Sequence, residues 1–165
     1  MDYKTEGKVY KQDNTSIYND DCMNILKQTP DNYYDLCICD PPYGSDNIKG
    51  GYTSGKGGKS GAGKQKDYNL NLWSMGKPKK EYFDELIRIS KNQIIWGANH
   101  FISEMPIDSP CWLVWDKQNE NTGFADCELA WCSFNKAVRK FSFMWNGMLQ
   151  GDMKNKEQRI HPTQK

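Results

Sequence analysis

Four consecutive residues, Asp40, Pro41, Pro42 and Tyr43, combine hydrogen-bond acceptors with a rigid backbone. Proline has no backbone N–H, so this corner offers a carboxylate and prolyl carbonyls, which are all acceptors. Such a corner suits an NH₂ group on an aromatic ring, because fixing both hydrogens exposes the nitrogen lone pair for attack. The Tyr43 ring adds a face or edge for a base. The alternative interpretation is a proline-rich turn in which Asp40 acts as a local cap.

The residues before this corner predict a strand that places it at the rim of a sheet. Residues 34–39 form a compact apolar run, typical of a strand buried on both faces in a parallel sheet. Two prolines cannot continue a strand ladder, so the chain leaves the sheet at Pro41. Ligands of open α/β sheets bind outside the carboxyl ends of strands, where Asp40 is expected to lie.

The remaining periodicity predicts an α/β sheet with parallel strands first and an antiparallel end. An acidic pair, Asp20 and Asp21, is expected to cap a short helix that ends before Pro30. Pro78 is expected to begin a second helix. This second helix is expected over residues 79–91, and an early strand over residues 16–19. Four later strands are expected at 94–96, 111–115, 128–134 and 138–145, and the last two form a hairpin around Asn135 and Lys136.

Two groups of basic residues are candidates for contact with phosphate. A glycine-rich segment at about 44–68 predicts a flexible surface loop, and its lysines are Lys49, Lys56, Lys59, Lys64 and Lys66. The alternative is a solvated loop without a partner. In the second group, Arg139 and Arg159 are candidates for reading guanine and Lys140 for DNA contact, and the alternative is ordinary surface charge.

Composition bounds the class of protein. The 165 residues fit one domain, and a net charge of +1 excludes a strongly basic nucleic-acid coat. No apolar run is long enough for a membrane span, and the polar N-terminus is not a secretory signal. Six cysteines without a C-x-x-C pair predict reduced core thiols in a cytoplasmic protein. Two histidines without ligand spacing predict no metal site.

Two signatures at opposite ends of the chain resemble the amino-group DNA methyltransferases of the permuted (β) class. The first runs from Asp21-Cys22-Met23-Asn24-Ile25-Leu26 through the Asp40–Tyr43 corner. The second, His161-Pro162-Thr163-Gln164-Lys165, is similar to the H-P-T-Q-K-P signature of that class. The resemblance implies an S-adenosylmethionine-dependent enzyme that methylates the exocyclic amine of a flipped base in double-stranded DNA, adenine N6 before cytosine N4.

The resemblance also implies roles for individual residues. Asp40 and the Pro41 carbonyl would hold the amino group at the corner completed by Pro42, and Tyr43 would stack on the base. Trp131 or Phe134 would sandwich the base, although both also suit the core of a strand. Asp21 and Cys22 would contact the adenine end of the cofactor, and the other cofactor residues would be His161, Thr163, Gln164 and Lys165.

The implied fold is an incomplete Rossmann-like methyltransferase sheet in a single domain over residues 1–165, with an antiparallel edge hairpin. The class continues after its second signature to a D-P-F-x-G-S-G cofactor loop, which is not found in these 165 residues. We therefore expect this chain to hold the target-base half. Either the natural protein is split or truncated, or the chain is a fragment, and a complementing C-terminal polypeptide is one candidate partner. The alternatives are a non-catalytic DNA-binding remnant, a subunit of a split enzyme, or a methyltransferase acting on a protein or RNA amino group.

Overall fold

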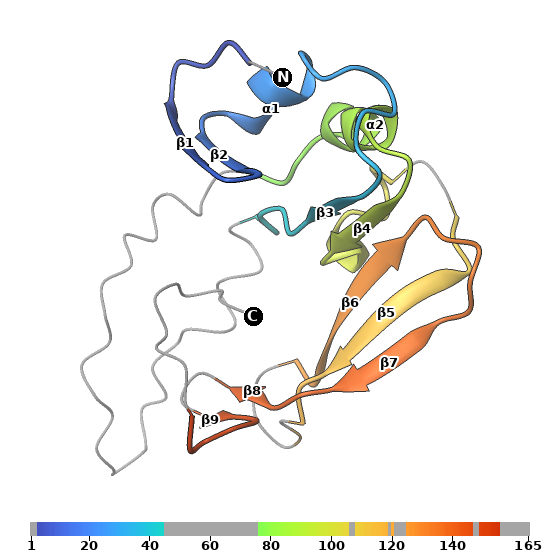
Figure 1. Cartoon of the computed structure of the whole chain (residues 1–165). Helices are drawn as coiled ribbons and strands as arrows, with labels where there is room; N and C mark the ends of the chain where they lie inside the picture. Colours follow the sequence, from blue (N-terminus) through green and yellow to red (C-terminus); the bar gives the residue numbers. More distant parts are fainter. Residues whose placement is uncertain are drawn as a thin grey trace.

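A computed structural model describes residues 3–44, 76–105, 108–118, 120, 125–146 and 149–155. Strands predominate among these residues (Figure 1). In chain order the elements are β1 (Lys8–Gln12), β2 (Thr15–Asn19), α1 (Cys22–Leu26), β3 (Cys37–Cys39), α2 (Lys80–Ile89), β4 (Gln93–Trp96), the 3₁₀ helix η3 (Ala98–His100), β5 (Cys111–Asp116), β6 (Cys127–Cys132), β7 (Arg139–Ser142), β8 (Trp145–Asn146) and β9 (Leu149–Gln150).

The largest sheet has five strands in the order β3-β4-β6-β5-β7. β3 is parallel to β4, and β5 is parallel to β7. β6 lies between these pairs and is antiparallel to both β4 and β5. Two separate antiparallel pairs, β1-β2 and β8-β9, complete the described strands. The carboxyl ends of β3, β4, β5 and β7 therefore share one edge with the amino end of β6.

The expectation of an α/β, incomplete Rossmann-like sheet is wrong, because the described residues are mostly β with two short α-helices. The expected antiparallel edge hairpin is also wrong, because β6 is interior and β7 pairs in parallel with β5. The burial of the two strands explains why β6 lies inside the sheet and β7 at its edge. Ala130, Trp131 and Cys132 of β6 are buried, whereas every residue of β7 is exposed, as suits an edge strand that carries charge.

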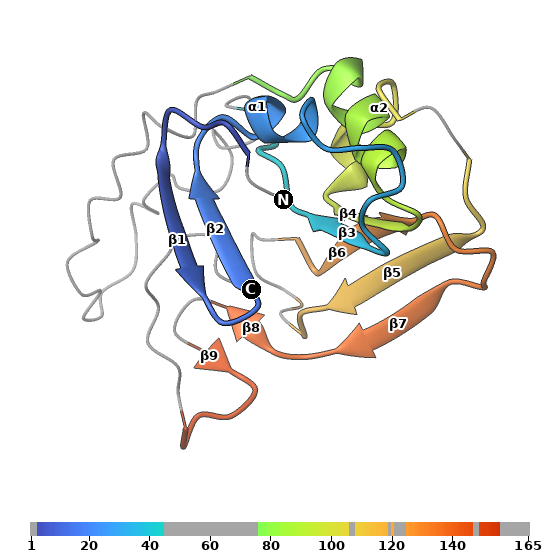
Figure 2. The ribbon, with the colours of Figure 1, turned by 45° about the horizontal axis from the view of Figure 1, so that its top comes forward.

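One face of the five-stranded sheet carries the core. Helix α2 buries Phe83, Leu86 and Ile89 along one side, and these residues cluster with Ile95 of β4 and Trp131 of β6. Both α-helices lie on this side of the sheet in Figure 2. The helix predicted at 79–91 is confirmed, and so are the strands predicted at 94–96 and 111–115.

The opposite face, called here the open face, is covered by no helix among the described residues. Side chains alternate between the faces of a strand, so residues in register with one another share a face. The open face accordingly carries Ile38, Ile94, Trp96, Leu113, Trp115, Arg139 and Phe141. Ile38 is 62% exposed, so the predicted burial of residues 34–39 on both faces is wrong.

The six cysteines are all free thiols, but only some of them lie in the core. Cys111 and Cys132 are buried opposite one another on β5 and β6, whereas Cys22 and Cys127 are exposed. The prediction of core thiols is therefore correct only in part. Within the described part of the chain, no helix has the length and apolarity needed to span a bilayer.

Helix α1 is fixed at both ends. The Met23 N–H donates to Asp21 Oδ1 over 2.9 Å, which confirms the predicted acidic cap. Beyond the other end, the Arg88 guanidinium of α2 donates to the carbonyls of Leu26 and Thr29 over 2.9 and 2.8 Å. These contacts join α1 to α2 shortly before the chain enters β3.

Candidate functional site

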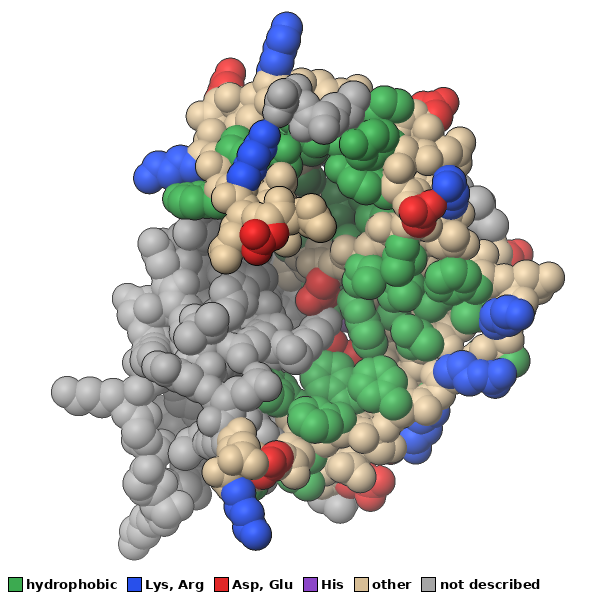
Figure 3. All heavy atoms as spheres, in the orientation of Figure 1, with side chains coloured by type: hydrophobic (Ala, Val, Ile, Leu, Met, Phe, Trp, Pro, Cys, Tyr) green, Lys and Arg blue, Asp and Glu red, His purple; other side chains and the backbone are tan. Residues whose placement is uncertain are grey.

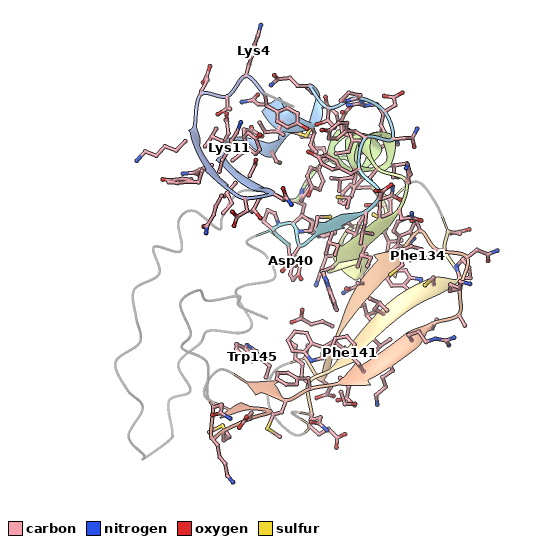
Figure 4. The ribbon with its side chains drawn as sticks, viewed as in Figure 1. Lys4, Lys11, Asp40, Phe134, Phe141 and Trp145 are labelled. Atoms are coloured by element: carbon pink, nitrogen blue, oxygen red, sulfur yellow. The ribbon has the colours of Figure 1, made fainter. Side chains whose placement is uncertain are left out.

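Asp40 directly follows β3, so it lies at the carboxyl edge of the sheet, where the sequence places it. Its side chain and that of Pro42 are exposed, whereas Pro41 is buried. Figure 4 shows Asp40 on the side of β3 that faces Phe141 and Trp145. The carboxylate is therefore held on a rigid turn at the rim and is accessible to a ligand.

Tyr43 is half-buried and held by three neighbours. Its hydroxyl donates to Asp40 Oδ1 over 2.8 Å. Its ring stacks on His100, with centroids 4.7 Å apart and ring planes 23° apart, and it meets Phe101 at 5.9 Å. The hydrogen bond shows that Asp40 does stabilise its own turn, as the alternative interpretation requires. It also orients the carboxylate relative to an aromatic ring.

Gly97 supplies the surface on which the Tyr43 ring rests. A Cβ at Gly97 would lie 2.1 Å from Tyr43 Cε1, and the backbone φ of +66° is one that L side chains rarely adopt. The Gly97 N–H donates to the Leu129 carbonyl over 2.9 Å, which ties the turn to β6. Gly97 was not among the residues predicted for the site. The signal for its role was a glycine directly after an apolar strand.

Charged groups surround this corner at the same edge of the sheet. The Lys77 ammonium donates to the His100 carbonyl over 3.4 Å. Burial lowers the pKa of His100, and the positive charge of Lys77 adds to this shift, while Glu128 opposes it. His100 is therefore neutral at neutral pH and stacks on Tyr43 as an uncharged ring. Glu128, at the amino end of antiparallel β6, forms an ion pair with Lys117.

The two further candidates for base stacking do not lie beside Asp40. Trp131 is buried in the core opposite Ile95 and Trp112. Phe134 follows the carboxyl end of β6, and because β6 is antiparallel it lies at the opposite edge of the sheet (Figure 4). The alternative interpretation as a core residue describes Trp131.

The described residues do not by themselves fit a cofactor. One carboxylate oxygen of Asp21 accepts the Met23 N–H as the cap of α1, and Cys22 is the exposed first residue of that helix. The other expected cofactor residues lie outside the described residues, namely His161, Thr163, Gln164 and Lys165.

The candidate DNA contacts are only partly described. Arg139 and Lys140 are neighbours on β7 and point to opposite faces of the sheet. Lys140 pairs with Asp116 over 2.7 Å on the helix side, whereas Arg139 lies on the open face. Lys49, Lys56, Lys59, Lys64, Lys66 and Arg159 lie outside the described residues.

The Asp40–Tyr43 corner, Gly97 and His100 form one connected unit built from β3, β4 and η3. Its chemistry is that of fixed acceptors beside an aromatic ring. Comparisons of the chain with protein-family models, with curated proteins and with solved structures find no match, so a function must be inferred from this geometry and from the motifs.

Proposed function

We propose that this chain carries the target-base site of an S-adenosylmethionine-dependent DNA methyltransferase that acts on the exocyclic amine of a flipped base, with adenine N6 as the first substrate to test. The observation that carries the proposal is the exposed Asp40 carboxylate on a proline-stiffened turn at the sheet edge, joined to the fixed ring of Tyr43. Acceptors beside an aromatic ring match an amino group on a planar base.

In this proposal the chain works mainly by positioning. Asp40 accepts one hydrogen of the amine and the Pro41 carbonyl accepts the other, which directs the nitrogen lone pair away from both. The half-buried Tyr43 ring contacts the base, and its hydrogen bond to Asp40 keeps ring and carboxylate in one geometry. When bound, S-adenosylmethionine supplies the electrophilic methyl group. The base must leave the duplex, because its amine is otherwise stacked and paired.

A methyl-transfer assay tests the role of Asp40. The full chain is incubated with labelled S-adenosylmethionine and duplex DNA, with and without a polypeptide that carries a glycine-rich cofactor loop. We expect label on adenine N6, and a loss of about 100-fold or more in Asp40→Ala, a magnitude seen when one stabilising group at a reacting centre is removed. Binding to DNA should survive the substitution.

Asp108→Ala is the matched control, because Asp108 is an exposed acid outside the site. Undiminished transfer by Asp40→Ala would contradict the role given to the carboxylate. Parallel reactions with RNA and with protein separate the alternative amino-group substrates, since label on either one in place of DNA would replace the DNA assignment.

One observation favours a second candidate, a non-catalytic DNA-binding protein. Asp21, the described acid of the expected cofactor site, is engaged in capping α1. Calorimetry with S-adenosylmethionine separates the two functions. Heat of binding that appears with the supplied polypeptide supports the methyltransferase, and its absence in both conditions supports the DNA-binding protein.

A further inference from the structure

An aromatic cluster occupies the open face at the carboxyl edge of the sheet. Trp96, Trp115 and Phe141 come from the ends of β4, β5 and β7. The ring centroids of Trp96 and Trp115 are 6.4 Å apart, those of Trp115 and Phe141 are 6.2 Å apart, and those of Trp96 and Phe141 are 6.5 Å apart. The Trp115 and Phe141 rings are stacked with planes only 6° apart, because these residues are in register on parallel strands.

One ring of the cluster is buried in the sheet, and another is partly exposed to solvent. Trp115 is buried, whereas Phe141 is 45% exposed and Phe143, two residues further along the chain, is 46% exposed. The backbone of Phe143 is fixed by two hydrogen bonds, since its N–H donates to the Asp116 carbonyl and its own carbonyl accepts the Trp115 indole N–H. Both rings are about half exposed, and the Phe143 ring also lies against Gly151, where an added Cβ would stand 2.7 Å from its Cε2. We call Trp96, Trp115, Phe141 and Phe143 the aromatic row.

Positive charge accompanies the row. Arg139 precedes Phe141 by two residues, so it points to the same face, and it is exposed. The Lys117 ammonium lies 5.4 Å from the Trp115 ring centroid, but its charge is paired with Glu128, so among the described residues the cation of the open face that is offered to a ligand is Arg139. Figure 3 shows apolar side chains gathered over the sheet, with Lys and Arg side chains along their outer margin and Asp and Glu side chains also beside them. Residues two apart on a strand are about 7 Å apart, a spacing that lets an extended nucleotide chain meet successive side chains.

The row also continues toward the Asp40 corner. Trp96 immediately precedes Gly97, on which the Tyr43 ring rests. Four strand spacings separate β3 from β7, a distance of about 19 Å at the usual separation of neighbouring strands. That span accommodates a few nucleotides beside a base held at Asp40.

We propose that the aromatic row binds unpaired nucleotides of a single DNA strand, with bases stacked on Phe141 and Phe143 and a phosphate near Arg139. The choice of DNA rests on the proposed function, in which the target base must leave the duplex. Exposed flat rings beside a guanidinium fit a chain of bases and phosphates, because stacking accepts any base and the cation meets the backbone charge. A protein with an apolar surface is the rival occupant.

Fluorescence anisotropy of a labelled 12-nucleotide single strand, titrated with the full chain, tests this proposal. The double variant Phe141→Leu with Phe143→Leu keeps the open face apolar but removes the two Phe rings. We expect roughly a tenfold or greater loss of affinity, because each stacked base contributes substantially to binding. The pair Phe141→Tyr with Phe143→Tyr should stay within about twofold of wild type. Tyr10→Leu, which removes an exposed ring from β1, is the matched control.

Phe143→Leu alone is the second variant, because it leaves the Trp115–Phe141 stack in place if the pair does not fold. Unchanged single-strand affinity in Phe143→Leu and in the folded pair would overturn the proposal and favour a protein occupant. If the Phe141→Leu and Phe143→Leu pair loses more affinity for an RNA strand, or for the fully paired duplex, than for the DNA strand, the assignment to unpaired DNA is overturned. Methyl transfer is measured on the same preparations. If the substitutions weaken strand binding but no methyl transfer is detected, the aromatic row is supported and the proposed function is not. If methyl transfer occurs and the substitutions leave strand binding unchanged, the proposed function is supported and the aromatic row is not.

Discussion

At the scale of single residues, Gly97 limits where Tyr43 can lie. The ring of Tyr43 fills the space that a side chain at Gly97 would need, and the positive φ at Gly97 turns the chain from β4 into η3. His100, at the end of that turn, stacks on the same ring. A substitution at one glycine therefore acts on the ring that contacts the proposed substrate.

We expect Gly97→Ala to destabilise the protein by about 1–3 kcal/mol, the cost of a residue held in an unfavourable backbone region. It should also lower methyl transfer, because the new Cβ displaces Tyr43 from Asp40. Urea unfolding and the transfer assay measure the two effects. Gly76→Ala is the control, because Gly76 has nothing within 4 Å of an added Cβ. Equal stability of the two variants would show that Tyr43 does not depend on Gly97.

At the scale of elements, the sequence predicted which residues form strands and helices better than it predicted their partners. The capped helix after Asp20, the helix after Pro78 and the strand at 94–96 follow from local signals of caps, proline and apolar period. Strand pairing depends on which faces become buried across the chain. The sequence around Asn135 predicted a hairpin, but β6 carries the buried Trp131 and therefore lies inside the sheet.

The same limit applies to the site. Asp40 and Tyr43 were predictable because four adjacent residues carry the chemistry. Gly97 and His100 were not predicted as parts of the site, because they meet Tyr43 only through the parallel pairing of β3 and β4. Phe134 was expected near the base from the resemblance, but the antiparallel course of β6 places it at the far edge.

Asp20 joins the β1-β2 hairpin to α1, and this link predicts that the fold loses stability at low pH. Its carboxylate accepts the backbone N–H groups of Glu6, Gly7 and Asp21. A hydrogen bond from the Thr5 side chain is the largest of the causes that lower its pKa to about 2, from an ordinary 3.8. A carboxyl with a lowered pKa in the folded state stabilises the fold above its ordinary pKa, and this contribution is lost as the pH falls toward 2.

We therefore expect Asp20→Asn to be less stable than wild type above about pH 4, with the difference narrowing as the pH falls to 2. Urea midpoints measured at several pH values between 2 and 6 follow this difference. Asp126→Asn removes the same charge from another exposed position and serves as the correction for net charge. A difference that stays constant over the whole range would contradict the assignment to Asp20.

At the scale of the whole molecule, a net charge of +1 makes the placement of charge more important than its sum. Replacing Lys49, Lys56, Lys59, Lys64 and Lys66 by Ala changes the formal charge from +1 to −4, since five positive charges are removed. Each lysine–phosphate pair that these substitutions abolish should reduce the salt dependence of duplex binding by about 0.9 in log–log slope. If these lysines meet DNA, the slope therefore falls by several units.

A second variant has Ala at Lys4, Lys8, Lys11, Lys27 and Lys79, which gives the same net charge of −4 from exposed positions elsewhere. Affinity titrations over a range of salt concentrations should flatten for the first variant and change little for the second. Equal flattening in both would show that total charge, and not the glycine-rich segment, attracts the duplex.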